Sequence, residues 1–129
     1  MKKVDLVLIE DNPHDAHILM RILKKEDLTE SIVWLKDGEA AVDNLIKEEK
    51  WLPKLILLDI KLPKVNGLEV LSKIRKHKTI RSVPVLMLTS SNQPVDVKAA
   101  YADGANAFLT KPNSYSDFKI LLKTMVNFW

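Results

Sequence analysis

Residues 55–63 read LILLDIKLP. In this stretch an aspartate, Asp59, directly follows four aliphatic residues, and a proline, Pro63, comes four residues later. A short, uniformly apolar run is typical of a strand that is buried on both faces. The runs of this kind along the chain are VDLVLI at 4–9, IVWL at 32–35, LILLDI at 55–60, VPVLMLT at 83–89 and NAFLT at 106–110. We therefore expect five short strands.

Segments in which apolar residues recur at helical spacing separate these runs. The first follows Asn12, a good helix cap, and has Pro13 at its first position. The expected helices span residues 13–26, 39–49, 67–76, 94–103 and 114–129. Their expected apolar stripes are, in order, Ala16, Leu19, Ile22 and Leu23; Ala41, Val42, Leu45 and Ile46; Leu68, Leu71 and Ile74; Val95, Ala99 and Ala102; and Phe118, Leu121, Leu122, Met125 and Trp129.

The alternation of strands and helices predicts the fold class. Uniformly apolar strands need cover on both faces, and strands that alternate with helices form βαβ units with parallel strands. The 129 residues suffice for one hydrophobic core. We therefore expect a single α/β domain over residues 1–129, with a doubly wound five-stranded parallel sheet between two layers of helices.

Composition excludes several classes of protein. The apolar runs are too short to cross a membrane, so we expect no membrane contact. The absence of cysteine excludes disulfides, thiolate metal sites and a cysteine nucleophile, and it fits the cytoplasm. The net charge of +3 is spread along the chain without a basic cluster, so we expect no nucleic-acid partner. Three glycines, none near another, exclude a P-loop and a dinucleotide-binding fingerprint.

Polar residues follow the expected strands where each strand ends. In doubly wound folds, ligands bind at the carboxyl ends of the strands, where the strand order reverses. The strand-end residues are Glu10 and Asp11, Asp37, Asp59, Thr89 and Ser90, and Lys111. Asp37 is interpreted as a turn residue. The side chains of the other strand-end residues are candidates for a single shared site.

Glu10, Asp11 and Asp59 are expected to converge from neighbouring strands. Two unit charges about 4 Å apart repel by about 4 kcal/mol at an effective dielectric constant of about 20. A proton, the Lys111 ammonium or a bound cation would neutralise the cluster, and carboxylates suit Mg²⁺ or Mn²⁺ better than zinc. A zinc pair at His14 and His17 is the alternative metal site, but no third ligand has a matching spacing.

Thr89 and Lys111 add a hydroxyl and an ammonium, which a metal site alone does not need. A phosphoryl group does need them, because its oxygens require neutralisation and well-placed donors. The set therefore predicts a phosphate site.

These residues together resemble the bacterial response regulator receiver (CheY-like) domain over essentially the whole chain. The motifs are Glu10-Asp11, Asp59 followed by IKLPKVNG, Thr89-Ser90 and Lys111-Pro112, with 48 residues from Asp11 to Asp59, 30 from Asp59 to Thr89 and 52 from Asp59 to Lys111. The resemblance implies a flavodoxin-like (βα)5 fold with strand order 2-1-3-4-5. It also implies a two-component phosphorelay response regulator, not an enzyme, that takes a phosphoryl group from a sensor histidine kinase.

The resemblance also assigns roles at the acidic residues. Asp59 would be the phospho-acceptor and would bind Mg²⁺ together with Asp11. The backbone carbonyl of Lys61 would be a further ligand, and Glu10 would act through water. Lys61 and Ser91 lie where receivers commonly tune dephosphorylation.

The remaining family roles concern the phosphoryl group and the switch. Thr89 would donate its hydroxyl, Ser90 its backbone N–H and Lys111 its ammonium to the phosphoryl oxygens. Pro112 resembles the cis-proline of the family, which would aim Lys111 inward. On phosphorylation, Thr89 and the aromatic Phe108 would move and change the surface formed by the fourth helix, the fifth strand and the fifth helix. Because Phe108 has no hydroxyl, it would act through ring burial alone.

Other functions use similar residues. A degenerate receiver that only binds partners is one alternative. A Mg²⁺-dependent aspartyl phosphohydrolase of the haloacid-dehalogenase type is another, but that family has an acid two residues after the aspartate, where this chain has Lys61. A flavodoxin-type electron carrier is disfavoured because EDNPHD at 10–15 would repel the FMN phosphate.

The end of the sequence bears on partners. No output domain follows the expected fifth helix, so a stand-alone receiver is expected. EDNPHDAHIL at 10–19 and the terminal FW resemble the stand-alone receivers paired with phytochrome-type histidine kinases. Ile120, Phe128 and Trp129 are the candidate interface residues for a partner or for a homodimer. The downstream target would be a protein.

Overall fold

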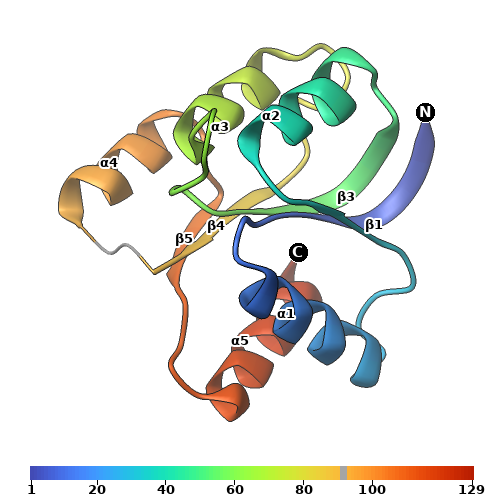
Figure 1. Cartoon of the computed structure of the whole chain (residues 1–129), viewed down its shortest axis with the longest axis vertical. Coiled ribbons are helices and arrows are strands. Elements are labelled where there is room, and N and C mark those ends of the chain that lie inside the picture. Colours follow the sequence, from blue (N-terminus) through green and yellow to red (C-terminus); the bar gives the residue numbers. More distant parts are fainter. Residues whose placement is uncertain (91–92) are drawn as a thin grey trace.

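The computed structural model describes residues 1–90 and 93–129. Figure 1 shows one sheet with helices packed on both of its faces. The elements are β1 (Lys2–Ile9), α1 (Pro13–Lys25), β2 (Ile32–Leu35), α2 (Gly38–Ala41), its π-helical continuation η1 (Val42–Lys47), β3 (Trp51–Leu58), α3 (Gly67–Lys76), β4 (Val85–Thr89), α4 (Pro94–Ala102), β5 (Ala107–Thr110) and α5 (Tyr115–Phe128).

The sheet confirms the expected fold class. Its strands are all parallel and run in the order β2-β1-β3-β4-β5. The order reverses between β1 and β3, so the carboxyl ends of these two strands form the switch point at which ligands bind in such folds. The register pairs Ile9 with Leu58, and the residues that follow them, Glu10 and Asp59, therefore leave the sheet side by side.

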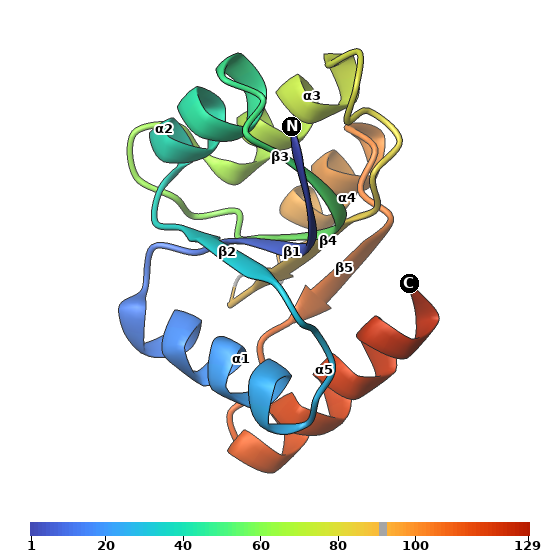
Figure 2. The same ribbon diagram turned by 90° about the vertical axis from the view of Figure 1, so that its right-hand side faces the viewer.

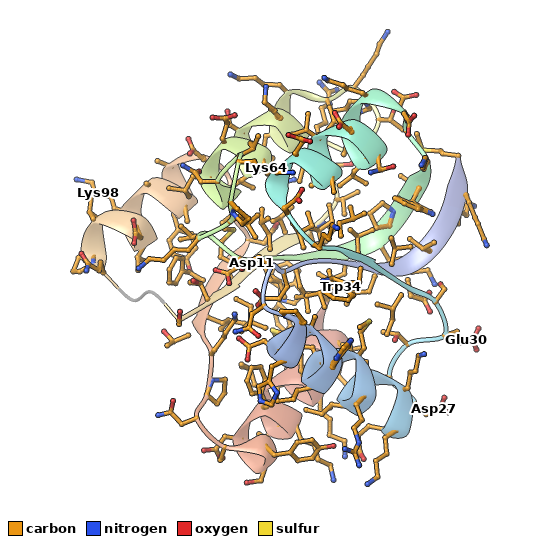
Figure 3. The ribbon with its side chains drawn as sticks, in the orientation of Figure 1. Asp11, Asp27, Glu30, Trp34, Lys64 and Lys98 are labelled. Carbon is orange, nitrogen blue, oxygen red and sulfur yellow. The ribbon has the colours of Figure 1, made fainter. Side chains whose placement is uncertain are left out.

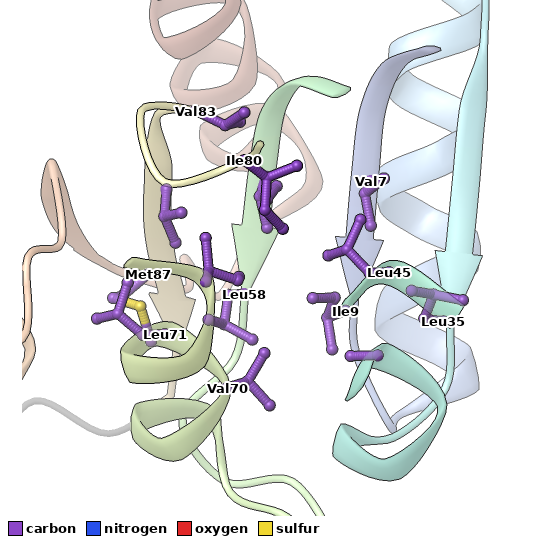
Figure 4. Packing of buried hydrophobic residues seen from close by; sticks show 14 of the residues in the cluster. Val7, Ile9, Leu35, Leu45, Leu58, Val70, Leu71, Ile80, Val83 and Met87 are labelled. Carbon is purple, nitrogen blue, oxygen red and sulfur yellow. The ribbon is translucent and has the colours of Figure 1, made fainter. Parts of the chain in front are cut away.

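Alternating strand residues divide the core into two layers. Val7, Ile9, Ile56 and Leu58 pack on the side of α2, α3 and α4 (Figure 4), whereas Leu6, Leu8, Leu55 and Leu57 pack against α1 and α5. Figure 2 shows the same two layers, with α1 and α5 together below the sheet. Burial of this kind stabilises by about 25 cal/mol per Å² of apolar surface. The central strands are therefore rigid supports for the residues at their ends.

Two strands begin earlier than the apolar runs indicate. β1 starts at Lys2 and β3 at Trp51, because the two strands pair along their whole length, from Lys2 with Trp51 onward. Pro53 lies inside β3, although proline is normally confined to sheet edges. Pairing with β4 begins only at Ile56, so β3 is locally an edge strand at Pro53.

The expected apolar stripe of the fourth helix is wrong. Val95 is 69% exposed and Ala102 is exposed, whereas Ala100 is fully buried. α4 has alanines on several of its sides, so spacing alone does not determine which side faces the sheet. The stripe of α1 is confirmed, since all four of its residues are buried. In α5, Phe118, Leu122 and Met125 are buried as expected, but Trp129 is 42% exposed.

No helix within the described part of the chain has the length and apolar character that crossing a membrane requires.

Arg75 on α3 joins the segments at the opposite end of the sheet from the switch point. Its Nε donates to Gly104 O at 2.9 Å, and its Nη1 donates to Val83 O at 2.8 Å and Arg81 O at 3.0 Å. Its Nη2 donates to Asn106 Oδ1 at 2.8 Å. One guanidinium therefore holds the connection before β4 and the connection before β5 against α3.

We expect Arg75→Met to lower the free energy of unfolding by about 2–3 kcal/mol, because several carbonyl groups lose a charged donor. Urea denaturation measures the change. Lys76→Met on the same helix, at an exposed position, is the matched control and should change stability by less than about 0.5 kcal/mol. Equal effects of the two substitutions would contradict the role of Arg75.

Candidate functional site

The backbone fixes the ends of β1 and β3 next to each other. The Asp59 N–H donates to Ile9 O at 3.1 Å, and the Glu10 N–H donates to Leu35 O at 3.1 Å. These ladder bonds continue one residue beyond the regular strands. The Cα positions of both acids are therefore set by the sheet, not by a loop.

Three carboxylates meet at this edge. One oxygen from each of Glu10, Asp11 and Asp59 lies within 4.8 Å of the others. Glu10 is 1% exposed and Asp59 is 6% exposed, whereas Asp11 is open to solvent at the end of β1 (Figure 3). The structure thus brings together the three acids that the sequence placed at one site, with two of them buried.

Lys111 supplies the positive charge that this cluster needs. Its Nζ forms an ion pair with Glu10, lies 3.0 Å from Asp59 Oδ2 and lies 3.0 Å from Asp15 Oδ2. The Lys111 side chain is 9% exposed, and its backbone N–H donates to Thr89 O at 2.9 Å. Lys111, which directly follows β5, therefore places a buried ammonium next to the acids at the ends of β1 and β3.

The electrostatics of the cluster follow from this arrangement. Burial raises the pKa of the Glu10 carboxyl to about 7, with help from the negative charge of Asp59, although the hydrogen bond from Lys111 opposes the shift. Burial alone would lower the pKa of Lys111, but its bonds to Glu10, Asp59 and Asp15 outweigh burial and raise it. The ammonium is therefore held firmly in its charged form.

Asp15 is a site residue that the strand-end pattern of the sequence did not indicate. It lies in the first turn of α1, and that turn begins at the same sheet edge because Asn12 caps it by accepting from His14 N and Asp15 N. No local pattern indicates this position, because the contact of Asp15 with Lys111 joins residues that lie far apart in the sequence.

Thr89 ends β4 with its side chain fully buried, and Ser90 follows it as an exposed residue. Ser91, an expected tuning residue, lies outside the described residues. Phe108 on β5 is half-buried, and its backbone N–H donates to the Tyr101 hydroxyl at 3.1 Å. The Tyr101 hydroxyl therefore connects α4 to the backbone of β5.

The expectation of a cis peptide bond before Pro112 is wrong, since no cis bond occurs among the described residues. Cis and trans forms of an X–Pro bond differ by only about 0.5–1 kcal/mol, so local context decides between them and the sequence does not. Lys111 reaches the acids with a trans bond. Its orientation comes from pairing along β5 and from the carboxylates.

The loop after Asp59 closes tightly on the end of β3. The Lys61 N–H donates to Asp59 Oδ1 at 3.2 Å, and the Gly67 N–H donates to Ile60 O at 2.7 Å. A Cβ at Gly67 would lie 1.9 Å from Asp59 O, closer than any side chain tolerates. The absence of a side chain at Gly67 is therefore a condition for the position of Asp59.

Asp37, at the end of β2, is a helix cap and not a member of the cluster. Its Oδ1 accepts from Ala40 N at 2.6 Å at the start of α2. Lys64, in the loop after β3, lies 3.8 Å from Asp37 Oδ2 (Figure 3). The sequence interpretation of Asp37 as a turn residue placed it outside the site, and the structure shows it as the N-cap of α2.

The donor set decides which metal the site fits. Within residues 1–90 and 93–129, the acids of the switch point are the one group of three or more metal-binding side chains close enough to share an ion. Hard carboxylate oxygens suit Mg²⁺ or Mn²⁺. The zinc alternative at His14 and His17 has no such support, because among the described residues neither histidine belongs to a group of this kind.

A cavity of about 430 Å³ lies away from these residues, beside the first half of β1. Its walls include Asp5, Thr29, Lys54 and Trp129. None of the strand-end acids lines it, so it takes no part in the chemistry of the cluster.

The chain is similar to known proteins over nearly its whole length. Residues 6–123 match the family model described as response regulator receiver domain. A probable methanogenesis regulatory protein, FilR2 of Methanothrix harundinacea, is 39% identical over 96% of this chain and 82% of its own length. The response regulator Rcp1 of Synechocystis is 33% identical over 96% of this chain and 87% of its own length.

Solved structures agree with the fold, and some of them contain a divalent metal ion. The Mn²⁺-bound form of Rcp1 superposes with a TM-score of 0.86 at 33% identity, covering 98% of this chain and 94% of that one. The phosphorylated cyanobacterial phytochrome response regulator RcpA gives a TM-score of 0.90 at 30% identity, with the same coverage of both chains. A receiver from Pseudomonas aeruginosa, 26% identical with a TM-score of 0.77 and 97% and 98% coverage, holds Mg²⁺ in its active-site cleft. The homologues confirm the expected cofactor, Mg²⁺ or Mn²⁺, and this chain has a cluster of three acids that could hold such an ion.

We expect Gly67→Ala to displace the backbone at Asp59, because the added Cβ has no room beside Asp59 O. Overpacking of this kind costs about 1–3 kcal/mol, which urea denaturation measures. Displacement of one acid should also weaken Mn²⁺ binding roughly tenfold, which the electron paramagnetic resonance signal of free Mn²⁺ measures. Ser72→Ala on α3 is the control, with both properties unchanged. Wild-type Mn²⁺ affinity in Gly67→Ala would contradict the constraint.

Proposed function

The chain belongs to the response regulator receiver domain family, and from this premise we propose that it accepts a phosphoryl group from a sensor histidine kinase on Asp59. The resemblance inferred from the motif residues is confirmed by the family match. The observation that carries the proposal is the buried Asp59 carboxylate at the switch point, 3.0 Å from the Lys111 ammonium.

In the proposed transfer, one bond forms and one bond breaks. An Asp59 carboxylate oxygen attacks the phosphorus of a phosphohistidine; the P–O bond forms, the P–N bond breaks, and the imidazole leaves as a neutral ring after taking up a proton. A bound divalent cation would neutralise the phosphoryl oxygens during this step. Lys111 is placed to pair with an oxygen of the acyl phosphate, since it already contacts Asp59 Oδ2.

The other residues have proposed roles that follow from their places at the sheet edge. Asp11 and Asp59 bind the metal directly, the Lys61 carbonyl is a further ligand, and Glu10 acts through water. Support comes from the spacing of the three carboxylates and from the bond that ties Lys61 N to Asp59.

The phosphoryl oxygens need donors on the side of β4. We assign these to the Thr89 hydroxyl and the Ser90 backbone N–H, because β4 lies next to β3 and Thr89 is its last residue. Receiver domains are signalling modules. We therefore propose no turnover of a separate substrate, only self-catalysed phosphotransfer and autodephosphorylation.

The output surface is proposed to be formed by α4, β5 and α5. Thr89 and Phe108 are the switch residues, and Tyr101 connects α4 to β5 through its bond to Phe108 N. This surface carries exposed apolar side chains, with Val95 at 69%, Tyr101 at 51% and Ile120 at 63% exposure. A downstream protein, or a second copy of the chain, is the proposed partner.

The relatives suggest the upstream partner. Structures described as bacteriophytochrome response regulators are 34% and 36% identical to this chain. We propose a phytochrome-type histidine kinase as the phosphoryl donor. The matches cover 82% and 87% of the own length of two curated relatives, so those relatives are only slightly longer than this chain. The absence of cysteine agrees with a reducing compartment, and we propose the cytoplasm.

Acetyl phosphate with Mg²⁺ should add one phosphoryl group to the wild-type chain, and Asp59→Asn should abolish the addition, because the amide has no nucleophilic oxygen. Intact-mass spectrometry measures both. Asp37→Asn is the matched control: it changes another buried strand-end aspartate to a residue that still caps α2, and it should label like the wild type. Full labelling of Asp59→Asn would rule out the assignment. A wild type that binds no Mg²⁺ and takes no phosphoryl group would favour a degenerate receiver.

We expect the chain to dimerise through α4, β5 and α5, with Ile120 in the contact and Phe128 and Trp129 at its border. Sedimentation velocity with and without beryllofluoride, a phosphoryl mimic, measures the association. Ile120→Glu should shift the equilibrium toward the monomer, whereas Thr79→Glu, which adds the same charge at an exposed position before β4, should not. A wild type that stays monomeric at high concentration under both conditions excludes the dimer.

A further inference from the structure

The turn from β1 into α1 carries Glu10 and Asp11, and its backbone must be fixed if their carboxylates are to stay in place. Glu10 N–H continues the ladder to β2 by donating to Leu35 O. On the other side, Ile9 O is the last acceptor of β1 toward β3, because it takes the Asp59 N–H. The Glu10 carbonyl therefore falls just beyond the ladder, and a strand-end carbonyl of this kind needs another donor.

Trp34 on β2 provides that donor. Its indole Nε1–H donates to Glu10 O at 2.8 Å, a short bond for an N–H donor. The register explains how the side chain reaches this point. Trp34 is the partner of Leu8, and Leu8 is buried on the side of α1 and α5, so the indole lies on that side of the sheet (Figure 3).

The indole is itself held in place. It is half-buried and packs against the core cluster between the sheet and α1. The His17 ring of α1 contacts it edge-on, with ring centroids 5.5 Å apart and an interplanar angle of 69°. Rings at this distance and angle attract each other. The donor therefore has little freedom to move away from Glu10 O.

The other contacts of the turn fix different atoms. Glu10 Oε2 accepts from Asn12 N at 3.2 Å, which orients the Glu10 carboxylate. Asn12 Oδ1 accepts from His14 N and Asp15 N, which fixes the start of α1. The bond from Trp34 acts on the peptide plane between Glu10 and Asp11, and the orientation of this plane sets the direction in which the exposed Asp11 side chain leaves the backbone.

We propose that Trp34 is a positioning residue of the metal site: its indole N–H locks the Glu10–Asp11 peptide and thereby holds the Asp11 carboxylate beside Asp59. This inference rests on the proposed function, since it concerns the divalent cation that the acids bind. Outer contacts that orient metal ligands change metal affinity by about 10–100-fold when removed. The indole N–H donates to a backbone carbonyl and not to a carboxylate, so Trp34 is not itself a metal ligand.

Loss of the Trp34 N–H should change the affinity for the metal but not the phosphorylation of Asp59 at saturating metal. Trp34→Phe keeps a ring in contact with His17 but removes the N–H donor, so Asp11 should spend less time in the binding position. The Mn²⁺ dissociation constant should rise roughly tenfold. Labelling by acetyl phosphate should be slow at low Mg²⁺ and should recover at saturating Mg²⁺ to within about twofold of the wild type, because Asp59 and Lys111 are untouched. A general loss of stability would not produce this recovery.

The experiment measures Mn²⁺ affinity by electron paramagnetic resonance in the wild type, Trp34→Phe and Trp51→Phe. Trp51→Phe is the matched control, since Trp51 is another half-buried tryptophan and starts β3 at the far end of the sheet. It should bind Mn²⁺ like the wild type. If Trp34→Phe also binds like the wild type while both proteins are labelled, the inference is overturned and the proposed function stands. If the wild type binds no Mn²⁺ and takes no phosphoryl group, both fail.

A second measurement uses the unmodified chain and remains valid if Trp34→Phe does not fold. The three indole N–H signals in the ¹H–¹⁵N spectrum are assigned by their loss in Trp51→Phe and Trp129→Phe. The Trp34 signal should exchange slowly with water and shift on addition of Mg²⁺, while the other two should not shift. A Trp34 N–H that exchanges as fast as that of the exposed Trp129, or that ignores Mg²⁺, would overturn the inference.

Discussion

The site depends on the attraction between one buried ammonium and the carboxylates that surround it. Glu10 and Asp59 are almost fully buried and would repel each other strongly without a cation. Lys111 contacts both of them and Asp15 as well. Removal of one partner from a buried ion pair costs about 3–5 kcal/mol, because the remaining charge is left uncompensated. The acids and the lysine are therefore a unit, and each tolerates burial only because the other is present.

The rest of the fold fixes the positions of these acids relative to one another. Parallel pairing of β1 with β3 sets Glu10 beside Asp59, and the cores on both faces of the sheet make these strand ends stiff. The tight loop closed at Gly67 fixes the chain after Asp59, while Trp34 and Asn12 fix the chain after Glu10. Such preorganised charge suits phosphoryl transfer, in which the protein supplies positioning and neutralisation more than covalent chemistry. In the proposed function, a phosphoryl group on Asp59 adds negative charge beside the Lys111 ammonium.

The sequence predicted the parts that periodicity and strand ends determine. Apolar runs indicated the five strands, and the residues after them include Glu10, Asp11, Asp59 and Lys111, which the structure brings together. Contacts between distant segments were not predictable in this way. Asp15 and Trp34 reach the site through the packing of α1 and β2, which no local pattern encodes, and the Pro112 bond and the buried side of α4 depend on small energy differences that tertiary context decides. Motif spacing was thus sufficient to locate the reacting groups. The residues that hold them in place could be identified only from the three-dimensional structure.

In the proposed function, the buried Asp59 carboxylate, and no other acid of the cluster, becomes the acyl phosphate. Borohydride reduces an acyl phosphate to an alcohol and so marks the modified residue permanently. After incubation with acetyl phosphate and Mg²⁺, reduction and peptide mapping by mass spectrometry should show homoserine at position 59 and unmodified side chains at Glu10, Asp11 and Asp15. Reduction at any of these three, or none at position 59 in a protein that carries the phosphoryl group, would contradict the account.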